Sequence, residues 1–192
     1  CNVIEIERGA DIAKVTTGIN IQNSASVSVT QNSVNGYTVS NTNRRGISSS
    51  LSTNGLIGCN LVDSTGIGFF FSGSNLFTNF RGNKMKYHLE GLHLDKTAVI
   101  DTQQHAGNQW LGNYTGWFGA VNLNAATQTD LFKSLFVVDP SLGSIFNPTF
   151  PTSTINPPYV DDGGWFNFQL GGTTYSCGNM SNCHDYELVD GE

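Results

Sequence analysis

The chain has 192 residues, of which 38% are hydrophobic, 11% aromatic and only 12% charged, with 22 glycines and a formal net charge of −6 at pH 7. The nine Lys and Arg residues are scattered along an acidic chain, which excludes the basic face of a nucleic-acid-binding protein. No apolar run approaches the length of a membrane-spanning helix, and the aromatic content is too high for a disordered chain.

A repeat runs through the first half of the chain. Each copy has a glycine followed by an aliphatic residue, and later an asparagine with an apolar residue two places on. The glycines are Gly18, Gly46, Gly66 and Gly91, the asparagines are Asn32, Asn60, Asn83 and Asn108, and the apolar residues are Val34, Val62, Met85 and Trp110. The asparagines are 28, 23 and 25 residues apart, which is the period of a solenoid whose coils stack on one another.

The repeat predicts an all-β fold, a single-stranded parallel β-helix of about four to five coils over residues 1–125. Successive asparagines should occupy equivalent corners and form a hydrogen-bonded ladder along the stack. Aliphatic residues such as Ile67 and Leu92 should point into the coils, because one coil alone cannot bury its apolar side. The competing interpretation is a sandwich or barrel in which the Gly and Asn spacings coincide by chance.

The first residues fit the same frame. Cys1-Asn2-Val3-Ile4 matches Cys59-Asn60-Leu61-Val62 in type and order, so we expect the chain to begin at the end of a coil, as a piece of a longer protein would. Cys1 and Cys59 would then lie two coils apart, roughly 10 Å, which is too far for a disulfide. Their predicted role is that of small apolar residues in one wall.

Four segments carry a resemblance to a known superfamily: Gly-Ile-Asn-Ile from Gly18, Asn-Gly-Leu-Ile-Gly-Cys-Asn-Leu-Val from Asn54, Glu-Gly-Leu-His-Leu-Asp from Glu90, and the run from Thr102 to Tyr114. They resemble right-handed parallel β-helix repeats of the pectate-lyase-like superfamily, as found in large bacterial secreted and cell-surface proteins, including cargo of the type IX secretion system. The resemblance implies right-handed coils and an extracellular location. It does not imply one function, because this fold serves lyases, hydrolases, depolymerases and adhesins.

A lyase of this superfamily would need a Lys or Arg base and acidic calcium ligands on one face. The candidates gather in the third and fourth repeats: Lys84, Lys86, His88, His93, Asp95, Asp101 and His105. The repeats contain no grouped carboxylates of the kind that hydrolases require. We therefore expect no catalytic residues, no resident metal and no cofactor in this chain, with Ca²⁺ entering only in the alternative enzymatic interpretation.

Aromatic residues gather at the end of the repeats. Trp110, Tyr114 and Trp117 could form a platform that stacks on sugars, or they could be core and cap residues that close the solenoid. His105 lies three residues before a ladder asparagine, where other repeats carry Val29, Ile57 and Phe80. We expect it either to be an inward polar residue satisfied by the backbone or Gln103, or to contact glycan with the aromatic residues.

Residues 126–192 are predicted to form an irregular, proline-rich segment that packs on or caps the solenoid. Trp165–Leu170 alternates like a strand, and Gly171-Gly172 suggests a turn into Thr173–Ser176, so a hairpin is expected. Cys177 and Cys183 flank a short loop rich in Gly and Asn, which favours a disulfide between them over free thiols or a metal site with His184 and Asp185. A disulfide would place the chain in an oxidising compartment.

The sequence thus favours a non-enzymatic structural or adhesive module of a secreted or cell-surface protein. Its partners would be surface glycan or other extracellular proteins, with no nucleic acid and no membrane span. The alternatives are a part of a polysaccharide-degrading lyase or hydrolase, and a glycan-binding module that presents the aromatic residues.

Overall fold

The computed structural model describes residues 2–6, 14–36, 41–112, 118–124, 128–143, 153–155 and 164–178. This part of the chain is all-β, and every strand ladder in it is parallel. Helical structure in the described ranges is limited to α1 (Gln128–Leu131) and to two 3₁₀ turns, at Phe132–Ser134 and Pro140–Leu142.

The strands form four sheets. Sheet 1 contains β1 (Val3–Glu5), β4 (Ser33–Asn35), β7 (Leu61–Asp63), β10 (Lys84–Lys86) and β13 (Gln109–Leu111). Sheet 2 contains β2 (Thr16–Gln22), β5 (Arg44–Ser50), β8 (Ile67–Ser72), β11 (Glu90–Leu94), β14 (Phe118–Asn122) and β16 (Ser153–Ile155). Sheet 3 contains β3 (Ser28–Thr30), β6 (Leu56–Gly58) and β9 (Asn79–Arg81), and sheet 4 contains β12 (Gln103–Gln104), β15 (Phe136–Val138) and β17 (Phe166–Phe168).

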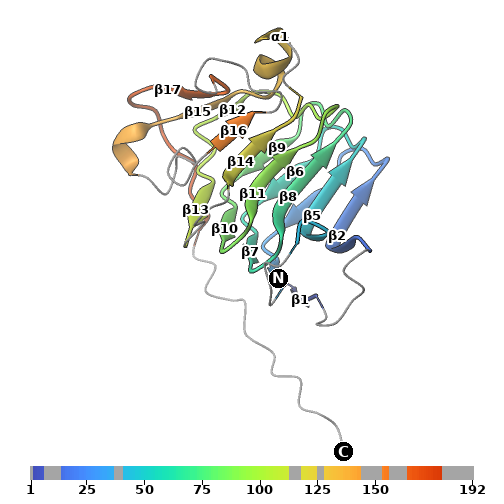
Figure 1. The fold of residues 1–192 in the computed structure, drawn as a ribbon. Coiled ribbons are helices and arrows are strands. Elements are labelled where there is room, and N and C mark those ends of the chain that lie inside the picture. The colour runs from blue at the N-terminus through green and yellow to red at the C-terminus, as the bar shows by residue number, and fades with distance from the viewer. Residues whose placement is uncertain are drawn as a thin grey trace, which may run out of the picture.

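Strand order within each sheet follows the order of the chain. From β2 to β10 the chain visits sheets 2, 3 and 1 in turn, and each return adds the next parallel strand. Figure 1 shows β2, β5, β8, β11 and β14 side by side across the front of the molecule. The predicted repeat is therefore present as a repeated set of parallel strands.

The core lies between the sheets and is built from stacked apolar side chains. The apolar residue two places after each asparagine is paired in register with its neighbours in sheet 1, namely Val34, Val62, Met85 and Trp110. Phe69 and Leu92 of sheet 2 are fully buried in the same cluster. Ile67 and Leu92 are 2% and 0% exposed, so both are buried as predicted; Leu92 belongs to the core cluster, whereas Ile67 lies in register with Arg45 and Glu90 and is not part of that cluster. Each such side chain contributes about 1.5–3 kcal/mol by leaving water.

A column of glycines lets sheets 1 and 2 approach closely. A Cβ at Gly46 would lie 2.1 Å from Val62 Cγ1, and one at Gly91 would lie 2.8 Å from Trp110 Cδ1. The register pairs Arg45 with Ile67 and Ile47 with Phe69, so Gly46 is opposite Gly68. The sequence alignment that matched Gly66 to Gly46 was therefore wrong by two residues, because Gly66-Ile67 imitates the Gly-aliphatic pattern.

The asparagines form the predicted ladder. The amide nitrogen of each donates to the carbonyl oxygen of the next: Asn2 to Asn32 at 3.0 Å, Asn32 to Asn60 at 3.0 Å, Asn60 to Asn83 at 3.0 Å, and Asn83 to Asn108 at 3.1 Å. The backbone N–H groups of the middle three also donate to the next side chain along the stack. The ladder thus holds one corner of every repeat in register.

The residue before each of four ladder asparagines has a left-handed backbone. Their φ angles are 57° for Gln31, 55° for Cys59, 65° for Gly82 and 66° for Gly107. This conformation turns the chain sharply from sheet 3 or sheet 4 into sheet 1, and glycine adopts it without steric cost. The corner is therefore a line of equivalent positions along the stack.

Two expectations for the second half were wrong. Strand pairing continues past residue 125, because β16 pairs with β14 and β15 pairs with β12. β17 pairs in parallel with β15, and residues 173–176 form no strand, so the expected hairpin is absent. The alternation in 166–168 indicated a strand correctly, but an added parallel strand satisfies its hydrogen bonds as well as a hairpin would.

Candidate binding groove

The stack of parallel strands is interrupted between β9 and β12, which belong to different sheets. The side chain of Gln103 bridges the interruption: its Oε1 accepts from Phe80 N at 2.9 Å, and its Nε2 donates to Thr78 O at 2.9 Å and Ile100 O at 2.8 Å. Gln103 is 5% exposed, so its buried amide satisfies backbone groups of residues 78 and 80 that a paired neighbouring strand would otherwise satisfy. The two strands are thereby held apart, and a groove opens over the bridge.

Residues 171–178, called the strap here, run back along the corner line of the repeats. Tyr175 N donates to His105 O at 2.8 Å, and the strap then passes over Gly107 and Gly82. It ends on a disulfide between Cys177 and Cys59, with Cα atoms 5.7 Å apart. The strap can lie this close because glycine occupies both positions beneath it.

The disulfide corrects two predictions. Cys177 pairs with Cys59 and not with Cys183, which lies outside the described residues, as does Cys1. Cys59 is therefore a crosslinking residue and not merely a small apolar one. Its left-handed corner position projects its side chain out of the stack toward the strap. The local spacing of Cys177 and Cys183 gave no signal for a partner 118 residues away.

The strap forms one side of the groove between β9 and β12. The groove has a volume of about 540 Å³, and residues 77–79, 81 and 101–106 line it together with Thr173 and Tyr175. Phe77 is 69% exposed, and the Arg81 guanidinium lies over the Tyr175 ring, 4.3 Å from its centre. Aromatic faces, amides, hydroxyls and one guanidinium thus share one open site.

Several polar atoms at the groove have unused hydrogen-bonding capacity. Thr78 Oγ1, Arg81 Nε and His105 Nδ1 are buried and have no hydrogen-bond partner. These three atoms have almost no accessible surface, so the hydrogen-bonding groups that the groove presents to solvent are instead the exposed side chains of Asn79, Thr102 and Gln104. On the other side of the groove, Asp101 accepts from Phe77 N at 2.5 Å.

The carboxylate of Asp139 anchors the start of the strap. One oxygen accepts from Ser141 Oγ at 2.6 Å and Ser141 N at 2.9 Å, and the other accepts from Gly171 N at 2.9 Å. The hydrogen bonds from Ser141 hold the pKa of Asp139 below its usual value, with smaller contributions from Gly171 and from His105. The charged carboxylate therefore keeps the strap beside His105, whose ring packs over Gly172.

The predicted glycan contacts have different outcomes. Trp110 is 2% exposed and donates from Nε1 to Gly119 O at 2.7 Å, so of the two roles considered for it the structure shows that of a core residue and not that of a sugar platform. Tyr114 and Trp117 lie outside the described residues. His105 lines the groove, although its expected partner Gln103 bonds elsewhere. Phe77 and Tyr175 were missed, because their sequence neighbours give no sign that the strap meets β9.

The residues considered for lyase chemistry are dispersed. Lys86 pairs with Asp63 at 3.1 Å on sheet 1, His93 with Glu90 at 2.5 Å on sheet 2, and Asp101 and His105 line the groove. Asp95 accepts from Lys96 N at 2.8 Å, and Lys84 lines a separate cavity beside the strap. Among the described residues, no three His, Cys, Asp or Glu lie close enough together to hold a metal ion.

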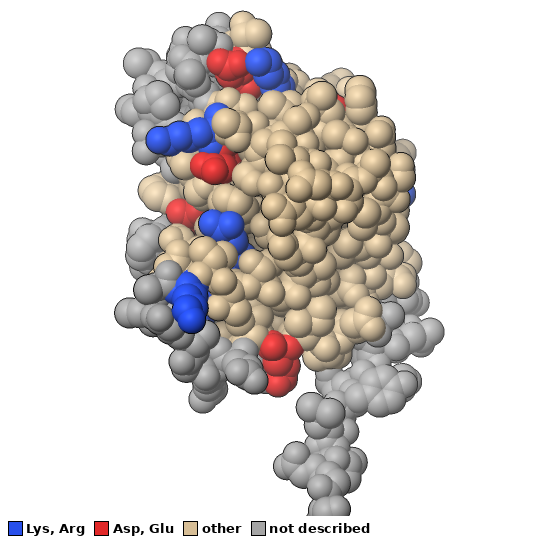
Figure 2. All heavy atoms as spheres, turned by 90° about the vertical axis from the view of Figure 1, so that its right-hand side faces the viewer, with Lys and Arg blue, Asp and Glu red and all other residues tan. Residues whose placement is uncertain are grey.

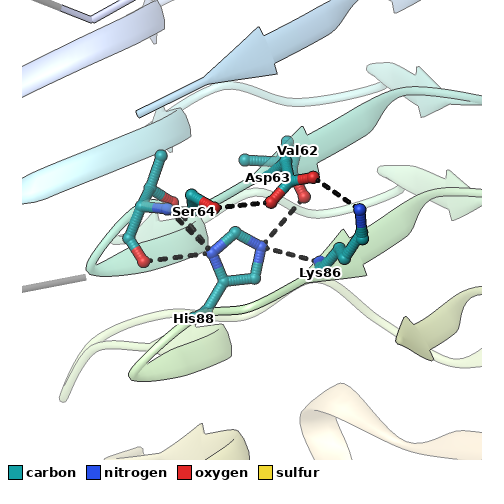
Figure 3. A network of polar contacts seen from close by, with 6 residues as sticks. Val62, Asp63, Ser64, Lys86 and His88 are labelled. Carbon is teal, nitrogen blue, oxygen red and sulfur yellow. Dashed lines mark hydrogen bonds and ion pairs between the residues drawn. The ribbon is translucent and has the colours of Figure 1, made fainter. Parts of the chain in front are cut away.

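His88 is part of a buried network between two repeats (Figure 3). Its Nε2 lies 3.0 Å from both Val62 O and Lys86 N, and its Nδ1 lies 3.0 Å from Thr65 Oγ1. Burial lowers the pKa of His88 from 6.5 to about 4, against the raising effect of the Thr65 and Val62 carbonyls. The ring is therefore neutral at pH 7 and joins the backbones of β7 and β10.

The outer face of sheet 2 carries a further cluster. The ring of Phe70 is stacked on His93, with centres 5.1 Å apart, and the Arg45 guanidinium lies 3.5 Å from the centre of the Phe70 ring. Burial lowers the pKa of Arg45, while Asp95 and Glu90 act in the opposite direction. These contacts cover an apolar ring with charged and aromatic groups.

No protein-family model, curated protein or solved structure matches the chain. Within the described ranges, no helix has the length and apolar character needed to cross a membrane.

Proposed function

We propose that the parallel sheets are the walls of one single-stranded parallel β-helix, and that the chain is a structural and adhesive module of a secreted or cell-surface protein. The observation that carries this proposal is the asparagine ladder, which links five successive repeats through buried side-chain hydrogen bonds. Such a ladder adds one rung per repeat and supports an extended scaffold. We also propose that the chain is related to the pectate-lyase-like superfamily.

The end of the stack at β2 and β3 supports the role of a module. Both strands lie at the ends of their sheets, and their sequences contain no charged residue. Figure 2 shows this side of the molecule as a broad face without Lys, Arg, Asp or Glu, with charges gathered along one margin. Edge strands usually carry charges that prevent pairing, so an uncharged edge suits the addition of another parallel strand.

The disulfide between Cys59 and Cys177 supports an extracellular location, because such bonds persist in oxidising compartments. The test is alkylation of the native protein in its producing cells before lysis, followed by peptide mapping. We expect Cys59 and Cys177 to escape alkylation and to be recovered as one crosslinked peptide. Alkylation of both thiols in the native protein would overturn the extracellular assignment.

The enzymatic alternative is disfavoured by the positions of its residues. A lyase needs its base and its metal ligands on one face, whereas Lys86, His93 and Asp101 lie on different parts of the fold. We expect no unsaturated products when the chain is incubated with uronate polysaccharides and Ca²⁺. Product formation that disappears in Lys84→Ala or Lys86→Ala would replace the scaffold by a lyase.

A further inference from the structure

We propose that the groove between β9 and β12 binds an uncharged saccharide, so that the strap and the interrupted stack together form a glycan site. The proposal deepens the adhesive role proposed above and rests on it, by giving that role a ligand and a location. The site is distinct from the aromatic cluster around Trp110, which is buried.

The aromatic residues give the groove a surface for stacking. Phe77 is 69% exposed although it follows a buried strand region, and Tyr175 comes from the strap on the opposite side. Pyranose rings present apolar C–H faces, which pack on aromatic rings. Phe77 has a left-handed backbone, with φ 61°, and its N–H donates to Asp101, so the backbone that carries the ring is fixed at the edge of the groove.

The charges of the groove indicate an uncharged ligand. Apart from His105, its charged lining residues in the described part of the chain are Arg81 and Asp101, which have opposite signs. An acidic polysaccharide would meet Asp101 within the groove and a net charge of −6 on the chain. A neutral saccharide meets neither penalty, and its hydroxyl groups can both donate and accept.

The exposed polar side chains of the groove match this chemistry. Asn79 and Gln104 can each donate and accept through their amides, and Thr102 can do both through its hydroxyl. Hydroxyl groups of a saccharide can pair with all three, whereas a carboxylate can only accept. The groove thus combines a stacking surface with accessible donors and acceptors.

The experiment is calorimetry of the oxidised full-length chain with mannan, xylan, β-glucan and galactan oligosaccharides. Polygalacturonate oligomers and a proline-rich peptide serve as the acidic and peptide probes. We expect binding of at least one neutral oligosaccharide, about tenfold weaker in Phe77→Ala, which corresponds to the loss of one stacked ring. Phe132→Ala removes an aromatic ring of 46% exposure outside the groove and should bind like the parent.

Gln104→Ala tests the polar side of the same site, because Gln104 is exposed and lines the groove. We expect weaker binding with an unchanged melting temperature. Binding of the acidic probe or the peptide alone, no binding at all, or equal affinities in Phe77→Ala and the parent would each overturn the saccharide site. None of these results would alter the alkylation pattern of Cys59 and Cys177. The saccharide site can therefore be disproved while the proposed extracellular scaffold is still supported.

Discussion

Asn60 and Asn83 use the full hydrogen-bonding capacity of their amides. Asn60 donates to Val29 O and Asn83 Oδ1, and it accepts from the N–H and the amide of Asn32. We expect Asn60→Ala to lower the free energy of unfolding by about 3 kcal/mol, because it leaves buried donors and acceptors unpaired. Chemical denaturation measures the loss. Asn20→Ala, at an exposed position of β2, is the control and should stay within about 0.5 kcal/mol of the parent.

The ladder and its burial pattern were predictable from the sequence, because side chains at one corner repeat with the period of the coil. Trp110 shows how far this reasoning extends. It occupies the slot of Val34, Val62 and Met85, which is an inward slot, and its large ring fits because Gly91 leaves space opposite. Position in the repeat therefore outweighs the tendency of tryptophan to form sugar-binding platforms.

His88 predicts a loss of stability in acid. Its pKa is lowered to about 4 in the folded chain, so the unfolded chain binds the proton more tightly. The contribution of neutral His88 to the free energy of unfolding is therefore fully present above pH 6.5. It is lost as the pH falls toward 4, by roughly 3 kcal/mol in total. His88→Gln should show a smaller decline between pH 7 and pH 4 in urea titrations.

The matched variant for this pH series is His93→Gln, which removes a histidine of sheet 2 paired with Glu90. It should keep the full acid-induced decline of the parent. If His88→Gln and the parent lost stability equally as the pH falls, the pKa of His88 would not differ between the folded and unfolded chain, and the prediction would be wrong.

At the scale of elements, the strap depends on the glycines under it. A Cβ at Gly107 would lie 2.0 Å from Tyr175 O, and Gly107 has φ 66°. We expect Gly107→Ala to displace the strap and to cost more than the roughly 1 kcal/mol of a left-handed alanine. Asn54→Ala isolates that backbone cost, because Asn54 is exposed and has a left-handed φ of 56°.

Thermal denaturation and limited proteolysis compare the two variants. Gly107→Ala should melt well below Asn54→Ala and expose the strap to cleavage. Equal melting temperatures and equal resistance would mean that the strap does not rest on Gly107 in solution.

The interruption between β9 and β12 could not be predicted from periodicity. The repeat places His105 where a strand residue such as Phe80 is expected, but the amide of Gln103 takes over the backbone hydrogen bonds of Phe80 and Thr78. Patterns of apolar residues report which side chains are buried, and they do not report which backbone groups a buried amide satisfies. For the same reason the alternation at Phe166–Phe168 identified a strand without identifying its neighbour.

At the scale of the molecule, the disulfide closes a loop with a sequence separation of 118. Constraining so long a loop in the unfolded chain is worth about 4 kcal/mol. We expect the double variant Cys59→Ala/Cys177→Ala to lose roughly this amount of stability in urea denaturation. Ser176→Ala, an exposed neighbour in the strap, should behave like the parent. A double variant as stable as the parent would show that other contacts hold the strap.

The disulfide also determines how the molecule would carry a mechanical load. Tension applied to the two ends passes through the covalent link between Cys59 and Cys177, so the repeats between them are shielded from force. Reduction would release a hidden length of roughly 400 Å of extended chain, estimated from the span of each residue. A chain crosslinked in this way would stretch little under load while the disulfide is intact and would lengthen greatly once its sulfurs are reduced.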